Sequence, residues 1–482
     1  MKETEPKTDY APTAAILNFT EISPENIGEY RKLSQSCPYL LACYSAGVLL
    51  MWKHYYNAAY ALCSGCVIIR VTINNKVQFL YPFACTDDGD IDAALAAIEK
   101  YTSKNSIPLS FHAVPRDELP RLALRYTNLS FSVNRNESDY VYDAEAMKSF
   151  AGRKYAARRN QLGRFKKRYP NAVLREYNPD VDSEKLARFW ERYEAGFKAD
   201  APLALVELEK SKEVFANPDI YGGHFVCVEE GGEIIAVCYG ETVGEMLIIH
   251  IEKALVSYDG VYQFMFSGFV KTYGAGCRYV NREDDVGMPG LRRSKLQYHP
   301  LKIEEYISVN VNTELIRLTE PPRIVTERLV LDLIGERDID AYNRLCLDVE
   351  HNKYWGYDYR EHVDGTPPRD YFWRDAMTDY ENKVSLTLAV RREGELIGEV
   401  VINEFDYCGS ANIGIRILPE YTGAGYGREA LSAAIEYALY KIGLSKVTAY
   451  CYKENIASYR LLSSCMEPQG EDGKFYYFSR RV

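Results

Sequence analysis

The sequence predicts an α/β protein with mixed sheets. Phe225–Val228 and Glu233–Tyr239 are β-rich runs on either side of two glycines, which is a hairpin signal. Gln263–Tyr273 places its aromatic and β-branched residues on one side, as a helix does. Asn412–Leu418 alternates isoleucines with smaller or polar residues and leads through a glycine turn into a second helix. Strands and helices that alternate in this way favour mixed sheets covered by helices.

Length and composition limit the class of protein. The chain has 482 residues, which favours about three domains, and its net charge of −10 argues against a nucleic-acid footprint over the whole surface. Of the 12 cysteines only Cys63 and Cys66 have CxxC spacing, and without a second pair they predict reduced thiols rather than a zinc site.

No targeting or membrane signal is expected. Residues 1–15 lack the apolar core of a signal peptide. Tyr39–Trp52, the longest uncharged apolar stretch, is too short to span a bilayer and predicts a buried helix. We therefore expect a cytoplasmic protein without an integral membrane segment.

Two breaks divide the chain. One lies near Asn312–Arg323, which ends at two prolines, and the other near Asp143–Gly152, where extended residues give way to a basic run. The predicted domains are residues 1–145, 146–311 and 322–482. A weak internal repeat supports copies of one fold, because four positions recur with identical spacing: Ile22, Ile27, Tyr30 and Leu33, then Ile334, Ile339, Tyr342 and Leu345.

A basic helix is predicted after the second break. Residues 153–168 contain no acid, and their cations are Arg153, Lys154, Arg158, Arg159, Arg164, Lys166, Lys167 and Arg168. Such a stripe either binds phosphates or is a solvated helix face. Both interpretations remain open at this point.

Carboxylates and cations gather in the segments that follow. Glu252, Glu283, Asp284 and Asp285 lie in apolar or glycine-rich surroundings, and the last three are near Arg282, Arg292 and Lys295 in the sequence. Acyl transfer to an amine needs a base and donors for the developing oxyanion. Buried ion pairs are the alternative, which we favour for Arg282–Asp285, whereas we favour ligand binding for Arg292 and Lys295. His224, His250 and His299 have no metal-ligand spacing.

These segments, taken with the basic helix, resemble the soluble catalytic region of bacterial phosphatidylglycerol lysyltransferases. The resemblance covers roughly residues 15–310 and rests on Tyr221–Phe225, His250–Ala254, Asn281–Gly287, Gly290–Lys295 and Tyr298–Pro300. It implies two acetyltransferase-like folds in tandem and an aminoacyl-tRNA donor. The corresponding candidate site is Arg158, Arg159, Glu252, Asp285, Arg292 and Lys295. The membrane helices of the lipid-modifying members are not seen, so phosphatidylglycerol is not implied as acceptor.

The glycine turn Gly423–Gly427 predicts an anion site. Its glycines allow successive N–H groups to point at one phosphate at the start of a helix. A Walker A loop would need Lys and Ser or Thr where Arg428 and Glu429 stand, and a dinucleotide-binding fingerprint would need glycine at 428. Both common phosphate-binding motifs are therefore excluded.

The C-terminal third instead resembles the GCN5-related N-acetyltransferases, in their ribosomal-protein-acetyltransferase branch. The evidence is Gly425 with Gly427, the strand Lys446–Tyr452, the motif Asn455–Ser458 and Thr326–Leu329. The resemblance implies acetyl-CoA or CoA as cofactor, with backbone amides of Ile417 and Leu418 on the pantetheine arm. The remaining cofactor residues would be Gly423, Ala424, Gly425, Tyr426, Gly427, Arg428 and Asn455.

The same resemblance implies a proton donor for the leaving thiolate, either Ser458 or Tyr459. Glu404, after the strand Glu399–Ile402, is the candidate base, with a surface turn as the alternative.

The whole chain is thus predicted to hold three acetyltransferase-like domains. Its expected function is acetyl transfer from acetyl-CoA to a small-molecule or peptide amine, fused to an aminoacyl- or acyl-transferase-like tandem. One alternative is an N-terminal tandem that only recognises tRNA or another polyanion. Another is a CoA-sensing binding protein without turnover.

Overall fold

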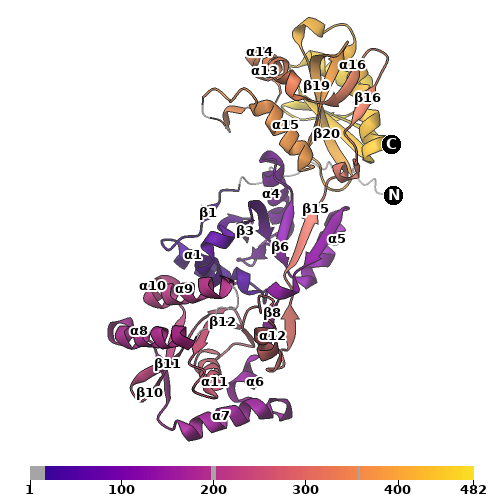
Figure 1. The fold of residues 1–482 in the computed structure, drawn as a ribbon. Helices are drawn as coiled ribbons and strands as arrows, with labels where there is room; N and C mark the ends of the chain where they lie inside the picture. The colour runs from indigo at the N-terminus through magenta and orange to yellow at the C-terminus, as the bar shows by residue number, and fades with distance from the viewer. Residues whose placement is uncertain (1–16, 197–201, 356–358, 362, 364) are drawn as a thin grey trace, which may run out of the picture. The chain divides into compact units, whose positions relative to one another are not determined.

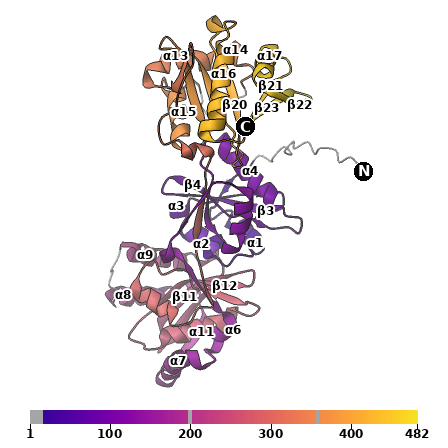
Figure 2. The same cartoon turned by 90° about the vertical axis from the view of Figure 1, so that its right-hand side faces the viewer.

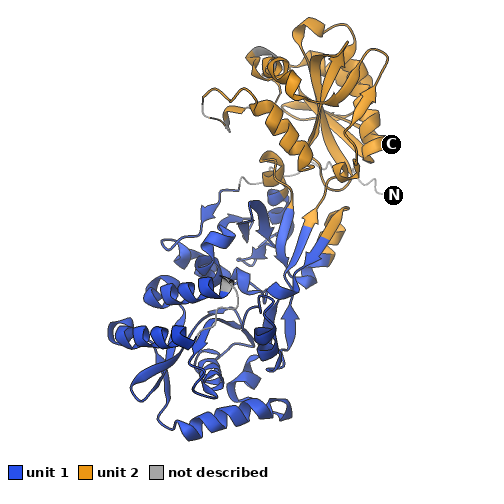
Figure 3. Ribbon diagram, in the orientation of Figure 1, with its two compact units in different colours: residues 1–98, 110–119, 131–309 blue, residues 99–109, 120–130, 310–482 orange. Residues whose placement is uncertain are grey.

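The computed structural model describes residues 17–196, 202–355, 359–361, 363 and 365–482, so the predicted absence of a signal peptide in residues 1–15 lies outside the described residues. The chain forms two compact units, one of residues 1–98, 110–119 and 131–309, the other of residues 99–109, 120–130 and 310–482 (Figure 3). Strands and helices are interspersed along the described chain, and the strands build three sheets (Figure 1). The predicted α/β class with mixed sheets is confirmed.

The first sheet has the order β1-β2-β3-β4-β6-β15-β7, with β5 paired to β3. Its strands are β1 (Thr20–Glu21), β2 (Ala59–Cys63), β3 (Cys66–Ile73), β4 (Lys76–Leu80), β5 (Phe83–Ala84), β6 (Ser110–Val114), β7 (Leu129–Val133) and β15 (Ile307–Val311). Its helices are α1 (Ile27–Ser34), α2 (Ala46–Met51), α3 (Lys53–Tyr56), α4 (Ile91–Lys104) and α5 (Leu119–Arg125).

The second sheet has the order β14-β8-β13-β12-β11-β10-β9. Its strands are β8 (Asp139–Asp143), β9 (Val173–Glu176), β10 (His224–Glu230), β11 (Glu233–Val243), β12 (Met246–Ala254), β13 (Tyr279–Asn281) and β14 (Lys302–Glu304). Its helices are α6 (Ala144–Ser149), α7 (Ala156–Arg168), α8 (Pro179–Gly196), α9 (Pro202–Ala216), α10 (Pro218–Tyr221), α11 (Val261–Tyr273) and α12 (Pro289–Leu296).

The third sheet has the order β16-β17-β18-β19-β20-β21-β23-β22. Its strands are β16 (Arg323–Val325), β17 (Val330–Leu333), β18 (Leu386–Arg392), β19 (Glu395–Asn403), β20 (Ser410–Ile417), β21 (Lys446–Tyr452), β22 (Glu467–Glu471) and β23 (Phe475–Arg481). Its helices are α13 (Ile339–Leu347), α14 (Val349–Asn352), α15 (Tyr371–Glu381), α16 (Tyr426–Tyr437) and α17 (Ile456–Cys465), and a π-helical turn, Ala438–Ile442, continues α16.

Each sheet repeats one pattern. The parallel pairs among the described registers are β4 with β6, β12 with β13, and β20 with β21, and the other described pairs are antiparallel. A helix joins the two strands of each parallel pair along the chain: α4, α11 and α16 respectively. Parallel strands need such a crossover, so the same strand–helix–strand arrangement occurs in each of the three sheets.

The first two sheets exchange strands across the predicted boundary at residue 146. β8 precedes that position and pairs with β13 and β14 of the second sheet. β15, near the end of the predicted second domain, lies between β6 and β7 of the first sheet. A cut at residue 145 would therefore separate β8 from its sheet.

The weak repeat falls on equivalent places. Ile27 is the first residue of α1 and Ile339 the first of α13, and both are buried. Tyr30 and Tyr342, one turn further on, are buried as well. The helix predicted over Tyr39–Trp52 is shorter than expected, because α2 begins only at Ala46, after Ser45 caps it by accepting from Val48 N–H.

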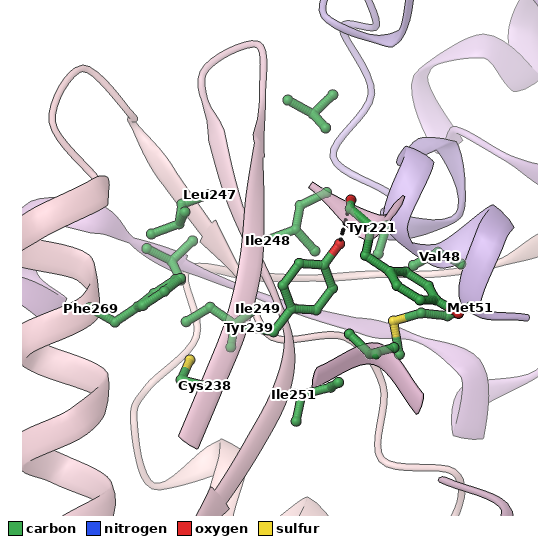
Figure 4. Close-up of a cluster of buried hydrophobic side chains, with 14 of the residues drawn as sticks. Val48, Met51, Tyr221, Cys238, Tyr239, Leu247, Ile248, Ile249, Ile251 and Phe269 are labelled. Atoms are coloured by element: carbon green, nitrogen blue, oxygen red, sulfur yellow. Dashed lines mark hydrogen bonds between the residues drawn. The ribbon is translucent and has the colours of Figure 1, made fainter. Parts of the chain in front are cut away.

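A large apolar core includes side chains of β11 and β12. Figure 4 shows Tyr239, Ile249 and Ile251 in this cluster, with the Tyr239 hydroxyl donating to the carbonyl of Tyr221 at 3.2 Å. α7 packs on α11 in the same unit, its Phe165 against Phe264 (Figure 2). In the part of the chain that the structure describes, no helix is both long and apolar enough to cross a membrane.

Candidate functional site

The candidate cofactor site begins where β20 and β21 separate. The two strands pair only at Ser410–Asn412 with Lys446–Thr448, although β20 continues to Ile417 and β21 to Tyr452. Backbone groups on the facing edges beyond these pairs are therefore not used in a ladder between the two strands. An extended polar chain can occupy such an opening by pairing with the strand edge.

The glycine turn follows directly and has the predicted geometry. Gly423 and Gly425 have φ of +77° and +86°, values that favour glycine, and both are exposed. Gly425 is the N-cap of α16 and provides no side-chain cap, so the first-turn N–H groups stay directed at the turn. A side-chain atom added at Gly423 would meet open space. This arrangement fits a pyrophosphate.

Arg328 is a site residue that the sequence reasoning missed. Its guanidinium donates to the carbonyl of Ala424 at 3.0 Å, pairs with Glu429 at 2.7 Å and lies over the ring of Tyr426. Thr326 also donates to Glu429. The sequence motif Thr326–Leu329 could have indicated this role, because this segment contacts the glycine turn and the first turn of α16. Arg428 is exposed and forms no ion pair within the part of the chain that the structure describes.

The backbone amides of Ile417 and Leu418, which were expected to bind pantetheine, differ in whether they already have a hydrogen-bond partner. The N–H of Leu418 donates to the carbonyl of Ile397 at 2.8 Å, so the expectation that it is free for a cofactor is wrong. The reason is that the antiparallel pairing of β19 with β20 runs to Gly398 and Ile417 and extends one hydrogen bond further. Ile417 itself lies beyond the last residue that β20 shares with β21.

Asn455 and Ser458 begin α17. The side chain of Asn455 accepts from the N–H of Ser458 at 3.0 Å, so this amide caps the helix. Burial raises the pKa of the Cys451 thiol, and a hydrogen bond with Ser458 lowers it in part. Since Cys451 lies in β21 beyond the last paired residue, Ser458 is placed beside the separated strands. Tyr459 instead packs against Tyr476, with ring centroids 4.7 Å apart and the ring planes tilted by 58°.

Glu404 follows β19 with φ of +47°, a left-handed conformation that is unusual outside glycine. Burial by surrounding protein raises the pKa of its carboxyl, although the residue keeps an exposed surface. Burial and then Glu404 raise the pKa of Tyr450 to about 12. Tyr450 is two residues beyond Thr448 in β21, so Glu404 lies near the same opening. A carboxyl with a raised pKa suits a base.

The N-terminal candidate residues mostly converge at one end of the second sheet. Asp285 is fully buried and accepts from Arg292 at 2.9 and 2.7 Å and from the Tyr140 hydroxyl at 2.5 Å. Glu252 pairs with Arg282 at 2.6 Å. These contacts match the ion-pair interpretation of Arg282–Asp285.

Lys295 and Arg292 are also used inside the fold. Buried Lys295 donates to the carbonyl of Arg282 at 2.5 Å and to that of Asp284. Burial lowers the pKa of this amine. Arg292 donates through Nε and Nη2 to Asp285 and Asn136, and its side chain is 33% exposed. Ligand binding by Arg292 and Lys295 stays a prediction.

The two candidate arginines of α7, Arg158 and Arg159, contact different parts of the fold. Arg158 donates to Gln297 at 2.8 Å and lies over the ring of Tyr298, which brings it to the α12 end of the cluster. Arg159 donates to the carbonyls of Phe150 and Gly152 and is not brought to the cluster.

Known proteins match both parts of the chain. Residues 42–309 match the family described as "Phosphatidylglycerol lysyltransferase, C-terminal", and residues 328–465 match "Acetyltransferase (GNAT) domain". An uncharacterized protein of Mycoplasmoides gallisepticum is 22% identical over 40% of this chain, which spans 63% of that protein's length. The uncharacterized N-acetyltransferase YoaA of Bacillus subtilis is 27% identical over 29% of this chain and 80% of its own.

A solved structure shares the fold of the larger part. The crystal structure of a conserved protein of unknown function from Bacteroides thetaiotaomicron aligns with a TM-score of 0.56 at 22% identity, over 61% of this chain and 100% of that one. The chain therefore belongs to the family of phosphatidylglycerol lysyltransferase C-terminal regions, and it carries a GNAT acetyltransferase domain at its C-terminus.

Proposed function

We propose that the C-terminal domain is an acyl-CoA-dependent N-acyltransferase that acetylates the amine of a small molecule or peptide. The observation that supports this most is the opening between β20 and β21 beside the uncapped start of α16. Gly423–Arg428 and Arg328 would hold the pyrophosphate of acetyl-CoA, and the free edge of β20 at Ile417 would hold the pantetheine arm. When bound, acetyl-CoA supplies a thioester carbonyl that an amine can attack.

The residues around the opening have two roles: one accepts the proton of the acceptor amine, and another supplies a proton to the leaving thiolate. Glu404, with its raised pKa and its place beside Tyr450, takes the proton of the acceptor amine. The Ser458 hydroxyl holds a proton beside β21. Tyr459 is less suited as the proton donor, because its ring packs against Tyr476 of β23. Asn455 positions Ser458, because its side chain accepts a hydrogen bond from the Ser458 N–H at the start of α17.

Thiol release from acetyl-CoA tests this function. We expect the wild-type chain to release free CoA thiol only when a suitable primary amine or peptide is supplied. Gly425→Glu should abolish this release, because it places a carboxylate in the phosphate cradle. Gly232→Glu is the matched control, since Gly232 is exposed, has a φ of +82° close to that of Gly425, and a side-chain atom there meets open space. No amine-dependent release across a broad panel of amines would contradict the proposal.

A second candidate function rests on α7 and concerns the N-terminal tandem. Lys166, Lys167 and Arg168 are exposed at the end of this helix, and Phe165 anchors its other face in the core. We infer that this end contacts a polyanion, with aminoacyl-tRNA as the leading substrate, and that the tandem is an aminoacyl- or acyl-transferase. The alternative of a recognition module without turnover is distinguished by whether bound aminoacyl-tRNA is consumed.

A further inference from the structure

The second sheet contains an opening equivalent to that between β20 and β21. β12 and β13 pair only at Met246–Ile248 with Tyr279–Asn281, and β12 continues to Ala254. Beyond the paired residues, β12 carries His250 and Glu252, and the chain after β13 carries Arg282 and Glu283. Arg282 pairs with Glu252, which leaves Glu283 beside His250 in this opening.

The helix start next to this opening is closed to a phosphate. Gly260, the N-cap of α11, has φ of +90°, like Gly425 before α16. A side-chain atom at Gly260 would lie 2.5 Å from the carbonyl oxygen of Gln161, because α7 packs directly on this turn. Asp259 also pairs with Arg164 of α7 at 3.4 Å. A CoA-type donor therefore finds no cradle here.

His250 is directed into the opening by a β-bulge. The register of β11 on β12 passes from Tyr239–Ile251 to Gly240–Ile249, so His250 is the extra residue. The imidazole is fully buried, with Nδ1 2.6 Å from Glu283 and Nε2 3.1 Å from Glu241. Burial alone would lower its pKa, but the two carboxylates raise it to about 9. The ring is thus an imidazolium that donates to both acids.

Glu241 completes a chain that leads from the core to the surface. Its Oε1 also accepts from the N–H of Gly47 in α2 at 2.5 Å, and its side chain is 2% exposed. Glu283, at the other end, is 25% exposed. Its bond to His250 uses only Oε1.

The backbone that presents Glu283 is strained. Glu283 has φ of +54° and Val286 has φ of +41°, conformations that non-glycine residues rarely adopt. The loop is held in place by Asn281, which accepts from Glu283 N–H, by Tyr140 N–H, which donates to the Glu283 carbonyl, and by Lys295. Strain that is fixed from several sides is typical of functional positions.

We propose that the chain Glu241–His250–Glu283 is a second ligand site, in which Glu283 binds the ammonium group of a primary-amine substrate. An ammonium brings three N–H donors to a carboxylate, and Glu283 has a 25% exposed side chain whose Oε2 takes no part in the bond to His250. Burial first, and then the charges of Glu283 and Glu137, raise the pKa of Asp284 to about 7 against the opposing charge of Lys295, so Glu137 adds negative charge near Glu283 whereas Asp284 is only partly ionised at neutral pH. In the part of the chain that is described, no His, Cys, Asp and Glu group is arranged for a metal, which favours an amine over a cation such as zinc.

Histidine NMR of the full chain tests this site without CoA, so the result is independent of the C-terminal proposal. The seven histidines are labelled with ¹³C, and His250→Gln assigns the His250 signal. We expect n-butylammonium to shift that signal saturably, whereas tetramethylammonium, which has the same charge but no N–H, does not. Absence of a saturable shift in the wild type, or equal shifts with both ions, overturns the proposal.

Two variants locate the effect at Glu283. Glu283→Gln keeps the size of the side chain and should weaken n-butylammonium binding by about tenfold or more, since it removes a charge-assisted hydrogen bond. Glu145→Gln is the matched control, because Glu145 is 79% exposed and pairs only with Lys148 in the same helix. Unchanged affinity in folded Glu283→Gln overturns the assignment. If that variant does not fold, the comparison of the two ions in the wild type decides.

Discussion

At the scale of single residues, the C-terminal domain depends on a buried charge pair. Arg416 Nε donates to Glu399 at 2.6 Å, and the Tyr342 hydroxyl donates to the other carboxylate oxygen at 2.8 Å. Both charged side chains are nearly inaccessible to solvent. Arg416 also lies over the ring of Trp355, so this pair fixes the face of β19 and β20 that leads to the opening.

Removing one partner of this pair should destabilise the domain strongly. We expect Glu399→Gln to lower the free energy of unfolding by about 3–5 kcal/mol, because Arg416 is left buried without its counter-charge. Glu393→Gln is the control, since Glu393 is 81% exposed and its pair with Arg392 contributes little. Urea unfolding of both variants measures the difference. Equal midpoints would show that the pair is not a major source of stability.

His250 predicts a pH dependence of stability. Its folded pKa of about 9 is raised above the unfolded value of about 6.5, so its contribution is complete below pH 6.5 and is lost as pH rises through 9. The full contribution is on the order of 3 kcal/mol. Wild type should therefore lose stability between pH 6.5 and 9.5 relative to His250→Gln, as measured by urea unfolding. A difference that is constant over this range would contradict a charged His250.

At the scale of elements, α7 has two different faces. Phe165 packs on Phe264, while the cations at the C-terminal end of the helix are exposed. If those cations contact phosphates, affinity for aminoacyl-tRNA should fall with salt at a log–log slope of about −0.7 to −0.9 per phosphate.

A filter-binding series at increasing salt tests α7. Lys166→Ala/Lys167→Ala/Arg168→Ala should weaken binding and flatten the slope, because three phosphate contacts are removed. Lys210→Ala/Lys212→Ala is a control of similar charge on α9, where both lysines pair with glutamates. Equal slopes for wild type and the triple variant would identify α7 as a solvated face.

Periodicity and turn chemistry were sufficient for several elements. β21 has the bounds of the strand expected at Lys446–Tyr452, and the hairpin of β10 and β11 turns at its two glycines. The helix over Tyr39–Trp52 was overpredicted, since an uncharged apolar run does not reveal that Ser45 caps a short helix. Apolar composition reports burial there but not the length of the element.

At the scale of the whole molecule, the sequence predicted three units but not their exchange of strands. β8 and β15 pair with sheets on the other side of the proposed boundary, and pairing between distant segments leaves no local pattern. The glycine turn could be predicted because its residues are neighbours in the sequence. The Glu241–His250–Glu283 chain could not be predicted, because its three residues come from separate segments and are brought together by a β-bulge that no sequence spacing indicates.

The central claim is that the turn before α16 is an open phosphate cradle, whereas the turn before α11 is covered by α7. Calorimetric titration of the full chain with acetyl-CoA tests it most directly. We predict one acetyl-CoA per chain, with affinity lost by about tenfold or more in Gly425→Glu and unchanged in Gly232→Glu. Binding that persists in Gly425→Glu, or a stoichiometry of two, would contradict the account.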